Sequence, residues 1–165
     1  MSDLPKGWDF ANMQDILEFN YGKGLPEKLR NKAGSVIVPG SNGVVGKHDK
    51  AITSGPTIIV GRKGSVGKVS FCLEGCWPGD TTYYIDKFPC NVPPKYWMYY
   101  LKFLRLGQHH KSSAIPGLNR KEVYNFEVPL PPIPEQRRIV AKLERLLHKV
   151  DACKERLEKI PQRDF

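Results

Sequence analysis

The sequence predicts an α+β (α/β) fold, in which a globular domain of β-hairpins and short helices is followed by one long C-terminal helix. Short β-branched runs, separated by Gly, Pro and Asn turns, predict the hairpins. An apolar repeat with alternating four- and three-residue spacings predicts the long helix. Four prolines within residues 129–134 separate the two patterns, because proline interrupts regular structure. We therefore expect a globular domain, a long helix and a short tail, at residues 1–133, 134–160 and 161–165.

The N-terminal part of the chain is expected to hold one short helix and one hairpin. Asn12 can cap a helix over Met13–Glu18 with its side chain. Residues 21–34 are rich in Gly, Lys and Pro, a composition typical of an irregular loop. A hairpin is expected to join Val36–Val38 to Val44–Val45, because the Asn-Gly pair between them tolerates the positive φ angles of a tight turn.

Three strands and a helix are expected next. The strands are Thr57–Val60, Lys68–Cys72 and Thr81–Asp86, and the first should be buried because it is β-branched throughout. The helix should run from about Pro94 to Leu106, with proline near its start and Gly107 at its end. Its aromatic residues recur at helical spacing, which is more typical of a core face than of a stacking platform. They are Tyr96, Tyr99, Tyr100 and Phe103.

The next segments are expected to be a loop, a short helix, a strand and a hinge. After the loop Gly107–Leu118, Asn119 should cap a helix over Arg120–Tyr124. Phe126–Val128 reads as a strand. The prolines that follow it should form a stiff, extended hinge before the long helix.

The long helix carries the apolar seam of a coiled coil. The seam consists of Ile139, Leu143, Leu146, Val150, Cys153, Leu157 and Ile160. About 26 residues extend roughly 39 Å at 1.5 Å per residue, which is longer than a domain of this size requires. Pairing with another helix is therefore favoured over packing on the chain's own domain. The flanking g positions Lys142, Lys149 and Arg156 are all basic, so like charges would meet in an antiparallel homodimer.

The formal net charge of +9 is concentrated in the middle of the chain. Residues 61–125 hold ten basic and four acidic side chains. A localised positive surface suggests a polyanionic ligand, of which duplex DNA is the commonest. Anionic lipid is disfavoured, because no basic amphipathic helix accompanies this charge. The basic g positions of the long helix suggest either a different partner helix or an edge that faces DNA.

Composition and motifs argue against several other classes of protein. The longest apolar runs are far too short to span a membrane, and the first residues lack the pattern of a signal peptide, so we expect a cytoplasmic protein. The cysteines do not have zinc-finger spacing and are interpreted as reduced, buried thiols. They are Cys72, Cys76, Cys90 and Cys153. No catalytic triad, nuclease pattern or methyltransferase motif is present, so we expect no active site, metal or cofactor.

The glycine-rich segment Gly61-Arg-Lys-Gly-Ser-Val-Gly67 is similar to a nucleotide phosphate loop. However, five residues instead of four separate its outer glycines, and Val69 stands where Ser or Thr is needed. No helix is predicted after it, so the helix N-terminus that holds a nucleotide phosphate is missing. An NTPase is therefore disfavoured. The loop is interpreted either as a hairpin with solvated basic ends or as a contact for DNA phosphates, through Arg62, Lys63, Ser65 and Lys68.

Six short motifs follow one another along nearly the whole chain. They are Leu4–Trp8, Gly40–Gly43, Gly61–Gly67, Trp77–Tyr83, Ala114–Arg120 and Pro129–Ile139. In this order they resemble the specificity subunit of type I restriction–modification systems. That subunit usually contains two target recognition domains, each followed by a long helix, and the two helices pair antiparallel as a ruler between the halves of a split DNA site. The resemblance implies one target recognition domain over residues 1–133 and its spacer helix over residues 134–160.

The resemblance also implies partners. A methyltransferase subunit would bring adenosylmethionine and modify adenine, and a restriction subunit would bring ATP-driven translocation and cleavage. Both cofactors would then belong to other chains, and this chain would be non-catalytic. Because the sequence stops at Phe165 without a second domain, it is interpreted as a half-length subunit that pairs with itself, or as a natural or engineered fragment of a full subunit. The alternative from a different class is a coiled-coil adaptor that does not read DNA.

The resemblance further sorts the candidate DNA contacts. Members read different sequences yet share the motifs, so motif residues should build the fold or grip phosphates, which carry no sequence information. This adds Asn119 and Arg120 to the phosphate candidates. Base reading is expected in residues 21–32, 47–50 and 107–113, where Lys or Arg suits guanine and Asn or Gln suits adenine. The base-reading candidates are Lys23, Arg30, Asn31, Lys47, His48, Gln108, His109 and Lys111.

Overall fold

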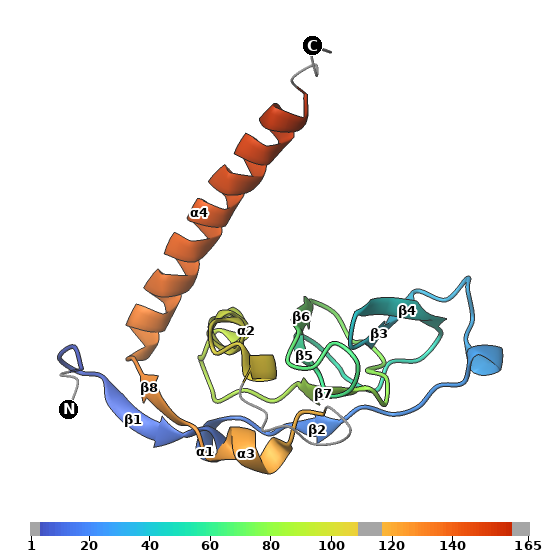
Figure 1. The fold of residues 1–165 in the computed structure, drawn as a ribbon, viewed down its shortest axis with the longest axis horizontal. Helices are drawn as coiled ribbons and strands as arrows, with labels where there is room; N and C mark the ends of the chain where they lie inside the picture. The colour runs from blue at the N-terminus through green and yellow to red at the C-terminus, as the bar shows by residue number, and fades with distance from the viewer. Residues whose placement is uncertain (1–3, 109–116, 160–165) are drawn as a thin grey trace.

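The computed structural model describes residues 4–108 and 117–159. Figure 1 shows an elongated body from which the helix α4 (Ile133–Glu158) rises at an angle, so that its C-terminal end lies far from the body. The described part of the body contains three antiparallel sheets, of two, four and two strands. Small sheets, short helices and one long terminal helix confirm the predicted fold class.

A four-stranded sheet with the strand order β2-β7-β5-β6 forms the centre of the body. Its strands are β2 (Asn20–Tyr21), β7 (Thr82–Ile85), β5 (Thr57–Gly61) and β6 (Val69–Cys72). Every residue of β5 is buried, as its β-branched sequence predicts. One row of neighbours crosses all four strands through Tyr21, Tyr83, Val60 and Val69. We call this row, where β5 ends and β6 and β7 begin, the loop end of the sheet.

The predicted hairpin is confirmed as β3 (Val36–Gly40) and β4 (Gly43–His48). Gly43, at the turn, has a φ of 143°, which favours glycine. The register shifts between Val38 and Pro39, because proline has no N–H to donate to a regular ladder. The Pro39 carbonyl accepts a hydrogen bond from Gly79 N at 2.9 Å, and this bond ties the hairpin to the segment before β7.

A strand pair that the sequence does not reveal joins the two ends of the body. β1 (Asp9–Asn12) pairs antiparallel with β8 (Glu127–Leu130), directly before α4 (Figure 1). α1 (Met13–Ile16) is shorter than the predicted helix over Met13–Glu18. The predicted Asn12 cap is also wrong, since Asn12 is the last residue of β1 and makes no side-chain capping hydrogen bond.

Residues 21–34 are more regular than predicted. Tyr21 belongs to β2, and η1 (Glu27–Leu29) forms a turn of 3-10 helix. Gly22 N donates a hydrogen bond at 3.0 Å to Thr82 O at the start of β7, and Lys23 N donates one at 2.8 Å to Pro78 O, before that strand. Partners this distant in sequence are invisible to a rule based on local composition.

The helix α2 (Pro94–Phe103) packs against the sheet and supplies much of the core. Trp97 and Leu101 are fully buried, and Tyr96 is only 5% exposed, as a core face predicts. Phe103, in contrast, is 77% exposed, so its assignment to the core is wrong.

The end of α2 also differs from the prediction. The helix stops before Leu106, because Arg105 adopts a left-handed φ of 48° that breaks the helical hydrogen-bond pattern. Leu106–Gln108 then form the 3-10 turn η2. Gly107 therefore lies beyond the helix and does not end it.

The short helix α3 (Arg120–Tyr124) begins and ends where predicted. The Asn119 side chain caps it, as expected, because its Oδ1 accepts a hydrogen bond from Lys121 N at 3.0 Å. The following strand, β8, starts one residue later than predicted.

Replacing Asn119 with alanine is expected to lower the free energy of unfolding by about 1 kcal/mol and Tm by roughly 2–4 °C, because a helix N–H loses its partner. Thermal unfolding followed by circular dichroism measures the change. Asn125→Ala is the matched control, since Asn125 ends the same helix and its side chain has no hydrogen bond to another described residue. Equal losses from the two substitutions would contradict the capping role.

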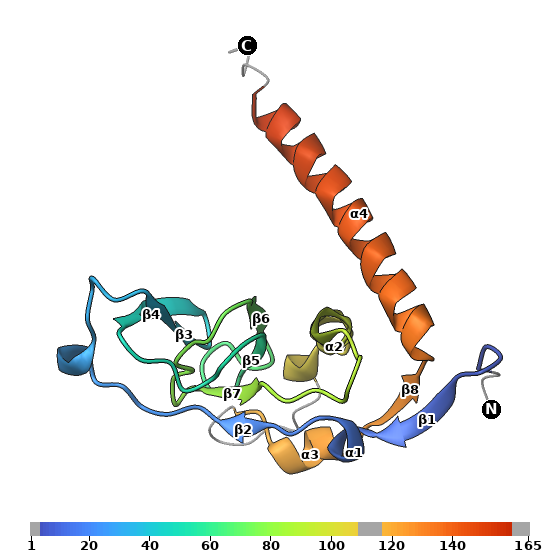
Figure 2. The ribbon, with the colours of Figure 1, turned by 180° about the vertical axis from the view of Figure 1, so that it is seen from behind.

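The long helix α4 contains 26 residues and begins one residue before the predicted start. An ion pair between Lys95 of α2 and Glu144 fixes its lower half to the body. Further along, Leu146 and Val150 are 46% and 48% exposed. Figure 2 shows from the opposite side that the upper turns of α4 project away from the sheets. The apolar seam therefore extends along α4 beyond the globular body, as the predicted length of the helix implies.

The prediction of buried thiols is confirmed for Cys72 and Cys76 and wrong for Cys90 and Cys153, which are exposed. The two buried thiols contact each other. A hydrogen bond to Cys76, together with burial, raises the pKa of Cys72, and the same hydrogen bond lowers the pKa of Cys76 to about 7. Within the described ranges, no three His, Cys, Asp or Glu side chains are grouped to hold a metal ion. No helix in these ranges is long and apolar enough to cross a membrane.

Candidate nucleic-acid interface

The glycine-rich loop of residues 61–68 connects β5 to β6 at the loop end of the sheet. It closes as a hairpin, since Gly61 N donates to Lys68 O at 2.8 Å. Arg62 N donates to Thr81 O at 2.9 Å and fixes the loop to the start of β7. A strand and not a helix follows the loop, so it lacks the helix N-terminus on which a nucleotide phosphate loop depends.

Two arginines flank one exposed tyrosine beside this loop. The guanidinium carbons of Arg62 and Arg120 lie 5.5 and 4.9 Å from the ring centre of Tyr21, which is 55% exposed. Each guanidinium also donates a hydrogen bond to a backbone carbonyl, Arg62 to Asp80 at 2.6 Å and Arg120 to Phe19 at 2.8 Å. Among the described residues, no carboxylate forms an ion pair with either arginine. The aromatic and carbonyl contacts thus fix both cations without neutralising them. We call this group the Arg62–Tyr21–Arg120 cluster.

Tyr83 packs against this cluster from the neighbouring strand. Its ring centre lies 5.0 Å from that of Tyr21 and 6.0 Å from the Arg62 guanidinium carbon. Its hydroxyl donates a hydrogen bond to Leu118 O at 3.0 Å. Burial, and then the neighbouring Tyr21 hydroxyl, raise the pKa of Tyr83 to about 12. The phenol is therefore neutral at physiological pH and leaves the positive charge of the cluster intact.

The other phosphate candidates lie on or near the same loop. Lys63 is exposed and Ser65 is partly exposed. Lys68 Nζ donates to Asn42 O at 3.0 Å and to Asn42 Oδ1 at 2.8 Å, so it ties the loop to the β3–β4 turn. The side-chain Oδ1 of Asn119 already accepts the capping hydrogen bond of α3. The structure therefore brings the phosphate candidates from two distant motifs to one end of the sheet.

A second group of candidates gathers around Trp77, beside the hairpin. The Lys23 ammonium lies 5.8 Å from the Trp77 ring centre, and the His48 ring packs against it edge-on at 5.1 Å. Trp77 Nε1 also donates to Lys23 O at 2.9 Å. Lys47, the neighbour of His48 on β4, is exposed. Trp77 thus brings base-reading candidates from two separate stretches next to each other.

Arg30 and Asn31 use much of their hydrogen-bonding capacity within the protein. Arg30 Nε and Nη1 donate to the carbonyls of Leu25 and Val45 at 3.0 and 2.8 Å. Asn31 Nδ2 donates to Asp49 Oδ1 at 2.8 Å, and its Oδ1 accepts from a backbone N–H at 3.0 Å. Both side chains therefore brace the segment before the hairpin against β4 and the residue that follows it.

Gln108 lies apart from this hairpin group. It belongs to η2 and lines a shallow hollow beside Lys68 of the glycine-rich loop. His109 and Lys111, the two remaining base-reading candidates, lie outside the described residues.

The candidate pairing residues follow the length of α4. Ile139 and Leu143 are partly buried at its base, whereas Leu146, Val150, Cys153 and Leu157 are exposed, and Ile160 lies outside the described residues. The base of the seam continues into an apolar groove of about 470 Å³ between α2 and α4. The groove is lined by Trp8, Tyr96, Tyr99, Tyr100, Phe103, Pro129, Ile139, Leu143 and Leu147. The exposed Phe103 therefore belongs to the same apolar surface as the seam.

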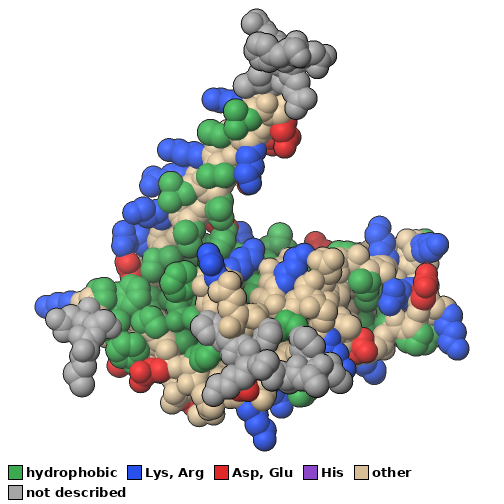
Figure 3. Space-filling model, viewed as in Figure 1, with side chains coloured by type: hydrophobic (Ala, Val, Ile, Leu, Met, Phe, Trp, Pro, Cys, Tyr) green, Lys and Arg blue, Asp and Glu red, His purple; other side chains and the backbone are tan. Residues whose placement is uncertain are grey.

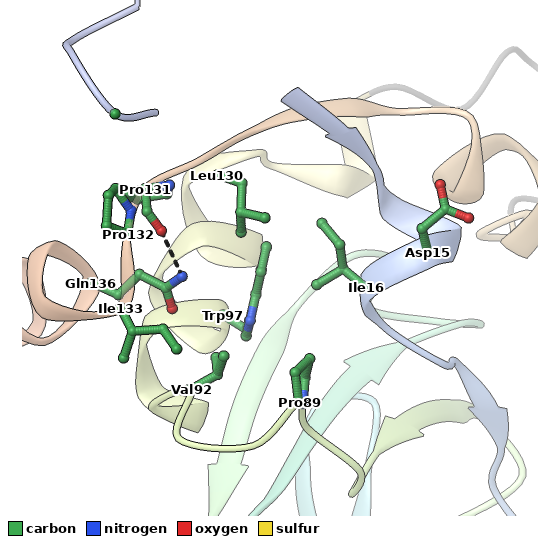
Figure 4. Close-up of a pocket in the computed structure, with 11 residues that line it drawn as sticks. Asp15, Ile16, Pro89, Val92, Trp97, Leu130, Pro131, Pro132, Ile133 and Gln136 are labelled. Atoms are coloured by element: carbon green, nitrogen blue, oxygen red, sulfur yellow. Dashed lines mark hydrogen bonds between the residues drawn. The ribbon is translucent and has the colours of Figure 1, made fainter. Parts of the chain in front are cut away.

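A separate cavity of about 510 Å³ lies where α4 joins the body (Figure 4). Gln136 Nε2 donates to Pro131 O at 2.9 Å on one side, and Trp97 faces it from α2. Asp15 is the one ionisable side chain among the described residues that line this cavity, and it points away from the others. The residues that line this cavity are mostly apolar and join the helix to the body. The described lining residues do not include the paired acid, base or nucleophile that catalysis needs.

Residues 5–162 match the family model of the type I restriction modification DNA specificity domain. This match spans nearly the whole chain. The chain belongs to this family.

Two curated relatives from Escherichia coli share part of the specificity domain. The identity is 32% over 81 residues with the type I restriction enzyme EcoDI specificity subunit, and 43% over 51 residues with the EcoBI specificity subunit. The matched segments cover 49% and 31% of this chain, but only 18% and 11% of those subunits. The specificity domain thus matches a minor part of either relative's length.

Solved structures share the fold of this specificity domain. The type I restriction-modification S subunit from M. genitalium superposes with a TM-score of 0.75 at 20% identity, over 94% of this chain and 44% of that one. The HsdS subunit from Thermoanaerobacter tengcongensis superposes with a TM-score of 0.71 at 22% identity, over 98% of this chain and 42% of that one. A structure from work on complex assembly and conformational transition of the type I R-M system gives 0.75 at 21% identity, over 93% and 42%. The chain spans less than half the length of each.

Tyr21 and Trp77, around which the two groups of candidates assemble, were not among the DNA contacts predicted from the sequence, although Trp77 begins one of the six motifs. Both are aromatic residues beside Gly and Lys or Pro, outside the helical periodicity that marks a core. An aromatic residue next to glycine or proline, outside a helical pattern, is therefore the signal by which such residues can be found.

Proposed function

We propose that this specificity domain binds duplex DNA and reads one half of a bipartite target. The observation that carries the proposal is the Arg62–Tyr21–Arg120 cluster, which holds two guanidinium groups in place without an ion-pair partner in the described parts of the chain. A guanidinium presents a planar fork of donors that suits the oxygens of a phosphate. Lys63, Ser65 and Lys68 supply further donors on the adjoining loop.

We assign base reading to the surface around Trp77. Lys23 and Lys47 present ammonium groups, which suit the acceptors of guanine in the major groove, and His48 adds a ring nitrogen beside Trp77. The internal hydrogen bonds of Arg30 and Asn31 favour a positioning role for these two residues. Gln108, His109 and Lys111 are further base-reading candidates, since the Gln108 amide suits adenine and the Lys111 ammonium suits guanine.

We infer that α4 sets the distance to the other half of the target. Its 26 residues extend about 39 Å, comparable to the roughly 34 Å of one DNA turn. The exposed seam would pair with the same helix of a second copy or with a second spacer helix of a longer chain. Antiparallel self-pairing would bring Lys142, Lys149 and Arg156 towards one another, a modest cost on a solvated surface.

The proposal extends to a non-catalytic role within a larger enzyme. A methyltransferase subunit would modify adenine and a restriction subunit would cleave DNA, each with its own cofactor, while this chain supplies target recognition. Membership of the specificity-domain family supports this division of labour.

A coiled-coil adaptor that does not read DNA is the second candidate. The exposure of Leu146, Leu147, Val150 and Leu157 favours it, because an adaptor needs only this seam. The adaptor function gives no role, however, to the two arginines beside Tyr21, which have no carboxylate partner among the described residues.

Salt dependence and sequence selection separate the two candidates. Affinity for random duplexes should fall steeply between 50 and 200 mM salt, because each phosphate contact contributes about 0.9 to the slope of log K against log salt. Repeated selection from random duplexes, with partner subunits present, should enrich one short recurring motif. An adaptor would show neither effect, and equal recovery of all duplexes would rule out sequence reading.

A further inference from the structure

A second basic surface lies on the other side of the glycine-rich loop. A shallow hollow of about 480 Å³ is lined by side chains from three segments, namely Lys68, Lys102, Arg105 and Gln108. Val66, Gly67, Val69 and Gly107 complete its described lining, which contains no acidic residue. We propose that this hollow binds a phosphodiester group of duplex DNA, held chiefly by Lys102 and Arg105. The inference rests on the proposed function, to which it adds a second contact with the DNA backbone.

Two glycines build this hollow by bringing the loop and η2 into backbone contact. A Cβ on Gly67 would lie 2.1 Å from Gly107 N, and a Cβ on Gly107 would lie 2.3 Å from Val66 O. Gly67 also has a φ of 74°, which favours glycine. No side chain fits between the two backbones. Lys68 and Gln108, the next residues in each segment, are therefore held on two sides of one concave surface.

The cations around the hollow are positioned but not neutralised. The Lys68 ammonium is bonded to an amide and a backbone carbonyl, neither of which carries a charge. Lys102 and Arg105 are both exposed, and neither forms an ion pair with a carboxylate of the described residues. Figure 3 shows Lys and Arg side chains along the edge of the body near α2 and β6.

The backbone of Arg105 adds an independent observation. Its left-handed φ of 48° is unfavourable for any residue other than glycine, asparagine or aspartate, and such strain clusters at functional sites. This conformation turns the chain from α2 into η2, so that Arg105 and Gln108 line the same hollow.

The hollow and the Arg62–Tyr21–Arg120 cluster lie beside opposite edges of the sheet. The cluster adjoins β2 and the hollow adjoins β6, with β7 and β5 between them. Strands are about 4.8 Å apart, so the two edges are separated by roughly 14 Å. A single small anion cannot span this separation, whereas the backbone of a duplex carries phosphates at several positions along its length.

The test compares Lys102→Ala/Arg105→Ala with wild type in binding to a labelled random duplex and to the selected target, over a series of salt concentrations. Lys6→Ala/Lys87→Ala is the matched control, because it removes the same charge from exposed positions before β1 and beyond the far end of β7. The contact of Lys87 with Glu18 at 3.9 Å is solvent-exposed and contributes little. Affinity should fall roughly 10- to 100-fold for both duplexes, and the salt slope should decrease by about 2. The control should lose little affinity for either duplex. Lys102→Ala alone, which leaves the strained backbone of Arg105 untouched, should lower the slope by about 1.

Wild-type affinity and slope in Lys102→Ala/Arg105→Ala would overturn the inference, provided that Arg62→Ala/Arg120→Ala still weakens binding. A loss confined to the selected target would overturn the assignment to phosphate, since phosphate contacts carry no sequence information. Absence of salt-dependent binding in the wild type would overturn the proposed function itself and this inference with it.

Discussion

Simultaneous replacement of Arg62 and Arg120 by alanine is expected to weaken DNA binding at least about 100-fold. A hydrogen bond to a charged group contributes about 1.5–3 kcal/mol, and two of them together exceed the roughly 2.7 kcal/mol that corresponds to a factor of 100. Both guanidinium groups are already fixed against Tyr21, at 5.5 and 4.9 Å, so little entropy remains to be lost when phosphate binds.

Fluorescence anisotropy of a labelled duplex over a salt series measures this effect. The slope of log K against log salt should decrease by about 2, one unit for each lost phosphate contact. Arg62→Lys/Arg120→Lys is the matched control, because it keeps the charge but loses the flat fork that stacks on Tyr21. It should bind with intermediate affinity and an almost unchanged slope. An alanine variant with wild-type affinity and slope would contradict the role of the cluster.

Replacing Leu146 and Val150 with aspartate is expected to abolish pairing through α4. The two side chains are 46% and 48% exposed in the isolated chain, so their remaining surface is available for burial against a partner. Full burial of an exposed side chain of this size stabilises by about 1.5–3 kcal/mol, of which roughly half is available here for each residue of each paired helix, and an unpaired carboxylate in its place adds a desolvation penalty. The dissociation constant for pairing should therefore rise about 100-fold or more.

Sedimentation or light scattering reports the mass of the free chain and of its complex with partner subunits. The globular domain should unfold at nearly the wild-type temperature, since neither residue belongs to its core. Ala141→Asp/His148→Asp is the matched control, because these exposed residues lie on the opposite side of the helix and should leave assembly intact. A wild-type mass for Leu146→Asp/Val150→Asp would rule out pairing through the seam.

Elements with strong local signals could be predicted from the sequence. The Asn119 cap, the Asn-Gly hairpin and the heptad pattern of α4 each depend on residues a few positions apart, and all three appear in the structure. Elements that depend on distant partners could not. β1 exists because it pairs with β8, more than a hundred residues further along the chain. α2 ends early because of the left-handed Arg105, where the sequence suggested the glycine two residues later.

The candidate interface shows the same division. The motif residues Arg62 and Arg120 could be proposed as phosphate contacts, but nothing in the sequence indicates that both pack on Tyr21. The sequence does not distinguish Arg30 from a solvent-exposed arginine, whereas in the structure its guanidinium donates hydrogen bonds to two backbone carbonyls. Charge can be read from a sequence, whereas its availability to a ligand depends on tertiary contacts.

Target reading by this domain can be tested by mapping methylated adenines after its co-expression with the methyltransferase subunit of the same system. We expect methylation at one recurring split sequence with a fixed spacing between its halves. Substitution of Lys23 or Lys47 should change the preferred bases in a half-site without changing that spacing. Methylation at unrelated sequences, or a pattern that is the same without this chain, would contradict the claim that it reads the target.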